Sequence, residues 1–265
     1  MPANKGLGHT FDTVARVYDK MRPGYPDALY DAVFAYMPVD AASVVAEVGS
    51  GAGQATEAFL QTGCSLVAIE PGANFGALLR EKFAKYPGFS LVPQKFEDAV
   101  FPPDTFDLVF SASAFHWVPE EVGYPAVYAM LRRGGAFARF ANHPDRFLAN
   151  PDLSRAIDEV YAKYYYPYHN LPPRTLTPYD ASQAEQRAQI AAKYGFTDIR
   201  CHLFHRERHF LGEEYIALLG TYSDHIAIEP VTRGKFFAAI AAAIDAHGGI
   251  LTLHDTLDLQ LARKA

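Results

Sequence analysis

The sequence predicts an α/β fold in which a mostly parallel, seven-stranded sheet is covered by helices on both faces and carries helical insertions. Two observations support this prediction. Between Ser43 and Phe140, short apolar runs typical of strands alternate with segments of helical periodicity. The strands are apolar along their whole length, which is typical of parallel strands buried on both faces. Ligands of such sheets bind beyond the carboxyl ends of the strands.

The first half of the chain supplies five of the expected strands and four helices. The helix predicted over 54–63 ends at Gly63, and the helix over 120–135 ends in arginines followed by glycines, which suits a helix C-terminus. The expected strands lie at 43–49, 65–70, 89–98, 105–115 and 136–140, and the remaining helices at 26–38 and 74–88.

After Phe140 the alternation stops, and the sequence predicts four regions in the whole chain. Residues 1–40 are expected to form an N-terminal helical cap, and residues 41–141 the ligand-binding core. Residues 142–182, rich in proline and without a clear strand, read as a helical insertion. Residues 183–265 return to the sheet with a helix at 183–195 and strands at 197–210 and 249–264, and contain a second helical insertion at about 212–248.

Composition excludes several classes of protein. The 265 residues are 49% hydrophobic and carry a formal net charge of -6, which disfavours a nucleic-acid binder. No apolar run approaches the ~20 residues of a membrane span, and residues 1–14 lack the apolar core of a signal peptide. Two cysteines make neither a disulfide framework nor a zinc cluster, so we expect a cytoplasmic protein without a metal.

The segment VVAEVGSGAGQATEAF, residues 44–59, reads as a strand, a glycine loop and a helix start. We use "glycine loop" for residues 49–54. The dinucleotide fingerprint G-x-G-x-x-G requires glycine at position 54, where this chain has Gln54. That difference argues against a nicotinamide-dependent oxidoreductase.

Two carboxylates next to this loop indicate a different ligand. Glu47 lies inside the apolar strand, where it would repel a pyrophosphate and suit a cation or an amino group. Glu70 ends the next strand, where an acid can accept two hydrogen bonds from a ribose diol. Together they favour a nucleoside with a positively charged, phosphate-free tail, namely S-adenosylmethionine (SAM). An unliganded strand-to-helix turn is the alternative interpretation.

Several motifs add a family resemblance. EVGSGAGQAT resembles the first motif of class I SAM-dependent methyltransferases, acidic-x-G-x-G-x-G, and Glu70-Pro71 resembles their ribose-binding acid. QKFEDAVFPPDTFDLVFSASAFHWV and the N-terminal FDTVARVYDKMRPGYPDALYDAV resemble the Methyltransferase-11 group. The resemblance covers about the first 140 residues and implies a Rossmann-like methyltransferase sheet in which the N-terminal segment and the two helical insertions form a lid.

The resemblance also implies roles for individual residues. Arg22 would pair with the methionine carboxylate and Tyr18 would lie near the sulfonium, whereas an amphipathic surface helix is the alternative for this pair. Many relatives have Asp-Ala-Glu where this chain has Lys95-Phe96-Glu97, so Glu97 and the Phe96 amide are expected to contact the adenine instead. The complete expected cofactor set is Tyr18, Arg22, Glu47, Gly49, Ser50, Gly51, Gly53, Gln54, Glu70, Pro71, Phe96, Glu97, Ser111 and Ala112.

The methyl acceptor is expected to be a small molecule, with oxygen or a carboxylate favoured. The fourth strand ends in SASAFHW, without the Asp/Asn-Pro-Pro-Tyr stretch of DNA amino-methylating enzymes. His116 is the candidate general base for a hydroxyl acceptor, and a histidine packed beside Trp117 is the alternative. A metal site made of His202, His205 and His209 is disfavoured, because a strand places residue 202 on the face opposite to residues 205 and 209. These histidines therefore read as polar positions on an outer strand. A non-catalytic SAM-binding protein is the alternative function, and the sequence leaves monomer and homodimer open.

Overall fold

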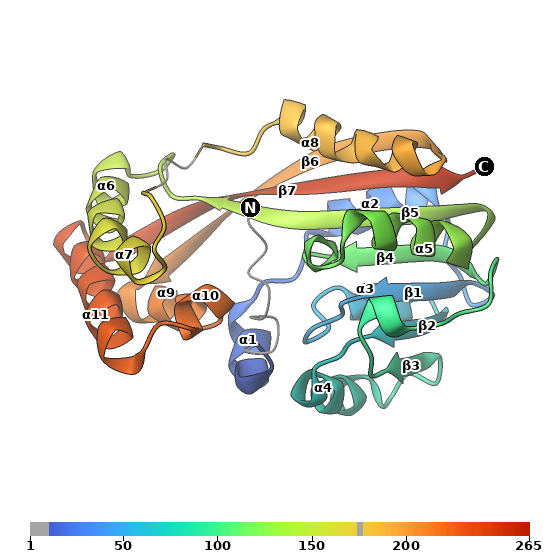
Figure 1. Cartoon of the computed structure of the whole chain (residues 1–265), viewed down its shortest axis with the longest axis horizontal. Coiled ribbons are helices and arrows are strands. Elements are labelled where there is room, and N and C mark those ends of the chain that lie inside the picture. The colour runs from blue at the N-terminus through green and yellow to red at the C-terminus, as the bar shows by residue number, and fades with distance from the viewer. Residues whose placement is uncertain (1–10, 174–176) are drawn as a thin grey trace. The chain divides into compact units, whose positions relative to one another are not determined.

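The computed structural model describes residues 11–173 and 177–265 and divides them into two compact units. Unit 1 holds residues 11–22, 143–173, 177–178 and 205–256, and unit 2 holds residues 23–142, 179–204 and 257–265. The first ten residues, part of the stretch in which we looked for a signal peptide, lie outside the described ranges. Figure 1 labels the helices and strands of both units.

Unit 2 contains the alternating strands and helices that the sequence predicts. Its strands are β1 (Val44–Val48), β2 (Ser65–Ile69), β3 (Phe89–Val92), β4 (Phe106–Ala112) and parts of β5 (Leu131–Asp145), β6 (Phe196–Leu211) and β7 (Ile250–Lys264). Its helices are α2 (Asp27–Tyr36), α3 (Thr56–Leu60), α4 (Ala73–Phe83), α5 (Glu120–Met130) and α8 (Ala181–Ala188), with 3-10 turns η3 (Phe96–Asp98), η4 (Phe115–Trp117) and η6 (Gln189–Tyr194).

The sheet confirms the predicted fold class. Its seven strands lie in the order β3-β2-β1-β4-β5-β7-β6, and it is mostly parallel with one antiparallel hairpin. The strand β1 pairs in parallel with β2 on one side and β4 on the other, so Glu47 lies opposite both Ala68 and Phe110. Strand order reverses between β1 and β4, and the crevice at such a point is where ligands of open α/β sheets bind.

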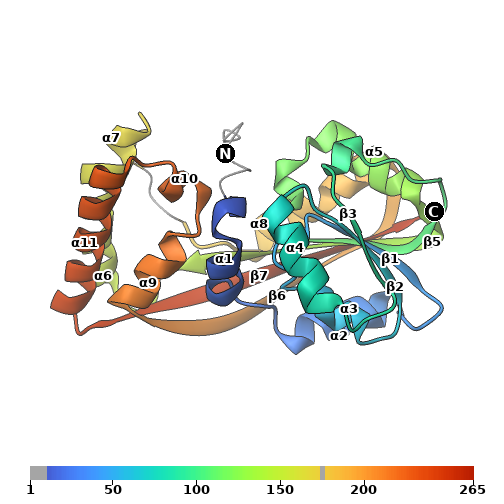
Figure 2. The same cartoon turned by 90° about the horizontal axis from the view of Figure 1, so that it is seen from below.

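Two apolar clusters cover the two faces of this sheet. On one face, residues of α2, α3 and α4, including Phe59 and Phe83, pack against the buried side chains of β1, β2 and β4. On the other face, η3, α5 and η6 contribute Phe96, Val127 and Ala191 to a second cluster. Figure 2 shows α2 and α3 on one side of the strands and α5 on the other. Burial on both faces explains why these strands are apolar throughout.

Several predicted boundaries are wrong. The strand expected over 89–98 ends at Val92 and the strand expected over 105–115 ends at Ala112, and each is followed by a 3-10 turn. The helix expected over 120–135 ends at Met130, and residues 131–135 already belong to β5, which the sequence placed at 136–140. Leu131 is fully buried and pairs with Phe106 of β4, so sheet pairing replaces the helix at this point. Gly134 then adopts a positive φ of 76° in the strand. The arginines at 132 and 133 therefore do not cap a helix.

Unit 1 is mainly helical, with its own apolar core that includes Phe236, Ile240 and Leu251. Asn150 caps α6 by accepting a hydrogen bond from the Leu153 amide at 3.0 Å. The elements are η2 (Phe11–Val14), α1 (Ala15–Met21), α6 (Pro151–Val160), the π-helix η5 (Tyr161–Tyr165), α7 (Tyr166–Tyr168), α9 (Gly212–Leu219), α10 (Ser223–Ile226) and α11 (Pro230–Ala246). Residues 143–145 of β5, 205–211 of β6 and 250–256 of β7 are also counted in this unit.

Within the described ranges, no helix combines the length and the apolar character needed to cross a membrane. Over the same residues, no three or more His, Cys, Asp or Glu side chains are grouped so that they could hold a metal ion.

Candidate functional site

The glycine loop leaves β1 at the carboxyl edge of the sheet in unit 2. The Gly49 amide donates to the Ile69 carbonyl at 2.9 Å, which extends the β1–β2 pairing by one bond, and the Gly53 amide donates to the Ser50 carbonyl at 2.9 Å. Gly49, Gly51 and Gly53 all have positive φ, at 71°, 55° and 79°. This backbone conformation is costly for any residue with a Cβ, so the loop requires its glycines.

Packing adds a second requirement at two of these positions. A Cβ on Gly49 would lie 2.5 Å from the Cβ of Ala114, and a Cβ on Gly53 would lie 2.6 Å from the ring of Phe83. The contact at Gly53 comes from core packing against α4. The contact at Gly49 comes from the segment that follows β4, so the end of β4 is pressed against the start of the loop.

Glu70 follows β2, and its carboxylate binds two backbone amides, one in the glycine loop and one at the start of α4. One carboxylate oxygen accepts from the Gly51 amide at 2.8 Å, and the other accepts from the Gly72 amide at 2.8 Å. Gly72 is the N-cap of α4, where the helix dipole favours a negative charge. Only 7% of Glu70 is exposed, so the carboxylate has a fixed position at the ribose-binding location that the resemblance implies.

Glu47 is almost completely buried in β1. One carboxylate oxygen accepts from the Thr56 hydroxyl at 2.6 Å, and the residue is 1% exposed. Burial raises the pKa of Glu47 to about 7, although the hydroxyls of Thr56 and Ser50 favour its charged form. Glu70 raises this pKa further, whereas Lys82 opposes the rise. A carboxylate held under such conditions is suited to a positively charged partner.

Three buried polar atoms of this region lack a hydrogen-bond partner among the described residues. They are Oε1 of Glu47, Oγ of Ser50 and Nε2 of Gln54. Buried polar groups are almost always paired, so a group of orphans at one loop indicates the place of a bound molecule. The Ser50 hydroxyl faces the Glu47 carboxyl without meeting hydrogen-bond geometry. A cofactor with both donors and acceptors fits this set.

The end of β4 lies next to the start of the glycine loop. The buried Ser111 hydroxyl donates to the Val48 carbonyl at 2.8 Å, and Ala112 is half-buried. Ser113 has a positive φ of 54°, a strained conformation for a residue other than glycine. Its amide donates to the Phe140 carbonyl at 2.8 Å, and its hydroxyl pairs with the Tyr25 hydroxyl at 2.8 Å. Hydrogen bonds with Phe140 and Tyr25 therefore hold Ser113 in this strained conformation.

The residues expected to contact the adenine differ in their exposure. Phe96 is buried in the core of unit 2, whereas Glu97 and Pro71 are exposed. Phe96 and Glu97 share the 3-10 turn η3, which follows β3. Their contacts with an adenine ring stay predictions.

Tyr18 and Arg22 belong to unit 1, whereas the glycine loop belongs to unit 2. Within unit 1, the Arg22 guanidinium donates through Nε to the Thr221 hydroxyl at 3.0 Å and lies over the rings of Tyr18 and Tyr222, 4.9 and 4.1 Å from their centroids. The predicted pairing with a methionine carboxylate stays a prediction.

The histidines singled out in the sequence lie in two places. His116 is exposed in η4, with its ring centroid 5.0 Å from that of Trp117, and its role as a base stays a prediction. The other three, His202, His205 and His209, lie on β6, where all are exposed. His209 pairs with the Thr252 hydroxyl at 2.9 Å, as expected for a polar strand face.

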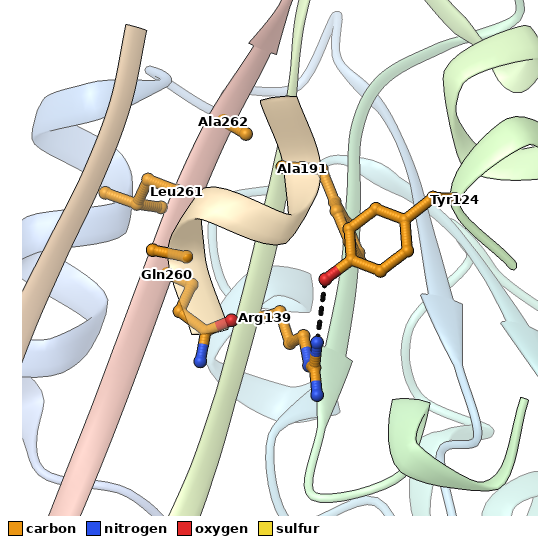
Figure 3. Close-up of a pocket in the computed structure, with 8 residues that line it drawn as sticks. Tyr124, Arg139, Ala191, Gln260, Leu261 and Ala262 are labelled. Atoms are coloured by element: carbon orange, nitrogen blue, oxygen red, sulfur yellow. Dashed lines mark hydrogen bonds between the residues drawn. The ribbon is translucent and has the colours of Figure 1, made fainter. Parts of the chain in front are cut away.

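Two cavities are lined by residues outside the glycine loop. One, of about 10 Å³, is lined in unit 2 by Tyr124, Arg139, Gln260 and neighbouring apolar side chains. Figure 3 shows Arg139 donating to the Tyr124 hydroxyl there, at 2.7 Å. It has room for about one water molecule. The other is an open groove of about 600 Å³ in unit 1, between α9 and α11.

Several residues that bind Glu47, the glycine loop or the end of β4 were not among the predicted site residues. Thr56 and Lys82 were read as ordinary helix positions, but Thr56 binds Glu47 and the Lys82 ammonium donates to the Ala52 carbonyl of the loop at 2.7 Å. Tyr25 and Ser113 lie 88 positions apart in the sequence, so no local pattern connects them. Thr56 alone had a sequence signal, because a hydroxyl nine residues after Glu47 begins the helix that follows the loop.

Comparison with known proteins agrees with this arrangement. Residues 46–138 match the family described as "Methyltransferase domain". Over 146 residues the chain is 27% identical to an uncharacterized methyltransferase of Mycobacterium tuberculosis, a match that covers 55% of this chain and 57% of that protein. The chain thus spans just over half the length of this curated relative.

Solved structures share the fold. A protein of Anaeromyxobacter dehalogenans assigned as a type II methyltransferase superposes with a TM-score of 0.63 and 20% identity, covering 91% of this chain and 97% of that chain. Phosphoethanolamine N-methyltransferase 2 of Haemonchus contortus, in complex with phosphomonomethylethanolamine and S-adenosylhomocysteine, superposes with a TM-score of 0.55 and 16% identity, covering 96% of this chain and 57% of that chain. At these identities the likeness shows the fold. Residues 46–138, which include the glycine loop and Glu70, thus match a methyltransferase domain, and the family match, the relatives and the solved structures together support a class I SAM-dependent methyltransferase with S-adenosylmethionine as cofactor.

Proposed function

We propose that this chain transfers a methyl group from SAM to a small-molecule acceptor, with oxygen or a carboxylate as the favoured receiving group. The observation that carries the proposal is the position of Glu70, whose carboxylate is fixed at the end of β2 by the amides of Gly51 and Gly72. An acid in this position suits a ribose diol. The buried Glu47, at the same edge of the sheet, suits the positive charge of the methionine part.

When bound, SAM supplies an electrophilic methyl group on a sulfonium, so the chain need not supply a covalent nucleophile. The residues of unit 2 must then bind SAM and orient it for methyl transfer. Glu70 would hold the ribose, and the glycine loop and the end of β4, with Ser111 and Ala112, would enclose the methionine part. Pro71, Phe96 and Glu97 are the proposed adenine-side residues. Positioning alone can supply a large share of the acceleration of such a reaction, with effective molarities of ~10⁵ M or more.

The residues outside this set have proposed roles at the acceptor. Tyr18, Arg22 and the helical insertions would form the lid that excludes water. A hydroxyl acceptor must lose a proton, and the exposed His116 is the proposed base. A carboxylate acceptor needs no base, and arginine or amide donors would recognise it.

The test is transfer of label from methyl-tritiated SAM to pools of small molecules grouped by receiving group: hydroxyls, carboxylates, amines and thiols. We expect the hydroxyl or carboxylate pool to be labelled, and labelling to fall strongly in Glu70→Ala. Labelling confined to amines would contradict the favoured acceptor. SAM binding without label in any pool would support the non-catalytic alternative.

A further inference from the structure

One buried polar atom near the end of β5 is not explained by the cofactor site. The side-chain carbonyl oxygen of Asn142, Oδ1, is buried and has no hydrogen-bond partner among the described residues. Leaving a buried acceptor unpaired is costly, and natural proteins rarely do so. The other orphan side-chain atoms of unit 2 lie in β1 and the glycine loop, so Asn142 marks a separate position.

The strand β5 carries Asn142 beyond the end of its neighbour. Ala112, the last residue of β4, pairs with Phe140 of β5, and β5 continues past that pair to Asp145. Side chains alternate between the two faces of a strand, so Asn142 follows Phe140 on the same face, two residues further along. Ligands of parallel sheets bind beyond the carboxyl ends of the strands, which is where β5 extends past β4.

The residue on this face before Asn142 is in contact with the strained segment that follows β4. The Phe140 carbonyl accepts from the Ser113 amide at 2.8 Å, and the Phe140 ring packs edge-on against Tyr25 with 4.7 Å between the ring centroids. Ser113 has a positive φ, and strain of this kind occurs mostly at functional sites. Asn142 therefore lies two positions from the residue that both Ser113 and Tyr25 contact.

The polarity of the orphan atom selects a class of ligand. A carbonyl oxygen only accepts hydrogen bonds, so the bound molecule must supply a donor. A hydroxyl supplies one through its O–H, whereas an ionised carboxylate has acceptor oxygens alone and is repelled by the negative end of the amide dipole. Of the two favoured receiving groups, the hydroxyl is the one that satisfies Asn142.

We propose that Oδ1 of Asn142 binds the hydroxyl group of the methyl acceptor and directs an oxygen lone pair towards the methyl group of SAM. This inference rests on the proposed function and narrows the receiving group to a hydroxyl. In the transfer, the lone pair forms the new O–CH₃ bond, and the electron pair of the broken S–CH₃ bond stays on the sulfur as a neutral thioether. The hydroxyl proton passes to the proposed base, His116, directly or through water.

The test measures transfer of label from methyl-tritiated SAM to the hydroxyl and carboxylate pools, and SAM affinity by isothermal titration. It compares the unmodified chain with Asn142→Leu, Asn142→Asp and a control, Gln61→Leu, which removes an exposed amide at the end of α3. We expect label in the hydroxyl pool and a fall of about tenfold or more in its rate for Asn142→Leu, with SAM affinity changed by less than about twofold. Gln61→Leu should change neither quantity.

Asn142→Asp keeps an acceptor oxygen at the same position in a side chain of similar volume. Its carboxylate can accept from a hydroxyl, so we expect labelling of the hydroxyl pool within about threefold of the unmodified chain. Equal losses in both Asn142 variants would show that the side chain only supports the fold and would overturn the inference.

Three further results separate this inference from the proposed function. Label confined to the carboxylate pool, or hydroxyl labelling that Asn142→Leu leaves unchanged, would overturn the inference while methyl transfer stands. A loss of SAM affinity that parallels the loss of labelling would assign Asn142 to the cofactor and would also overturn it. Binding of SAM by the unmodified chain without label in any pool would contradict the proposed function itself.

Discussion

The carboxylate of Glu70 accepts a hydrogen bond from the backbone amide of Gly51 at 2.8 Å, so the end of β2 holds the loop that leaves β1. The same side chain also binds the Gly72 amide at the start of α4. One acid therefore joins three segments at the edge of the sheet, and it does so at the position proposed for the ribose. The side chain proposed to bind the ribose therefore also fixes the conformation of the glycine loop.

Replacing Glu70 by alanine should weaken SAM and S-adenosylhomocysteine alike, by about 10- to 100-fold, because the ribose is common to both ligands. Isothermal titration measures both affinities. Glu57→Gln is the control, since Glu57 pairs with Lys85 on the exposed side of α3. A loss confined to SAM would contradict a ribose role for Glu70, because the two ligands differ only at the sulfur.

Gly49→Ala should lower the free energy of unfolding through two separate effects. The positive φ costs about 1–3 kcal/mol, and overlap of the new Cβ with Ala114 costs about 1–3 kcal/mol more. Gly134→Ala isolates the first effect, because Gly134 has a φ of 76° and no atom within 4 Å of an added Cβ. Urea denaturation should show Gly49→Ala as the more damaging change, with partial recovery in the double variant with Ala114→Gly. Equal losses at the two glycines would show that the segment after β4 does not press on the loop.

Stability of the unliganded chain should fall as pH rises through about 7. The pKa of Glu47 is raised to about 7 from a usual 4.5, so the folded state binds a proton that the unfolded state has released. The stability that this proton contributes is fully present below pH 4.5 and is lost as pH rises through 7, with a total on the order of 3 kcal/mol. Glu47→Gln should remove this part of the pH dependence in urea titrations between pH 5 and 8. An unchanged pH profile in the variant would contradict the assignment to Glu47.

Tyr25→Phe should reduce the free energy of unfolding by about 1 kcal/mol and weaken SAM binding, because its hydroxyl helps to hold the strained Ser113 next to the loop. Ser113→Ala should cost about the same, and the double variant little more than either, since both remove one bond. Tyr36→Phe is the control: its hydroxyl donates to the Asp198 carbonyl at 2.8 Å, away from the loop. It should lower stability without changing the SAM affinity. Additive losses would show that Tyr25 and Ser113 act independently.

The sequence predicted the parts of the site that local rules determine. The alternation of apolar strands and helices predicted the sheet. The glycines, Glu47 and Glu70 predicted the loop and its two acids, because the residues that form each pattern lie within about 25 positions of one another in the sequence. The end of helix α5 was misjudged, since pairing of Leu131 with Phe106 outweighs the local signals of arginines and glycines. The Tyr25–Ser113 contact and the Lys82 anchor depend on tertiary packing and have no local pattern. The division into two units depends on contacts between segments far apart in the sequence, and the hydrophobic periodicity of single segments cannot predict such contacts.

Binding of SAM at the carboxyl ends of β1 and β2 is tested most directly by titration of the unliganded chain with SAM. We expect a dissociation constant on the order of micromolar for the unmodified chain and a strong loss in Glu70→Ala. Absence of measurable binding by the folded chain, or binding of NADH in place of SAM, would contradict it.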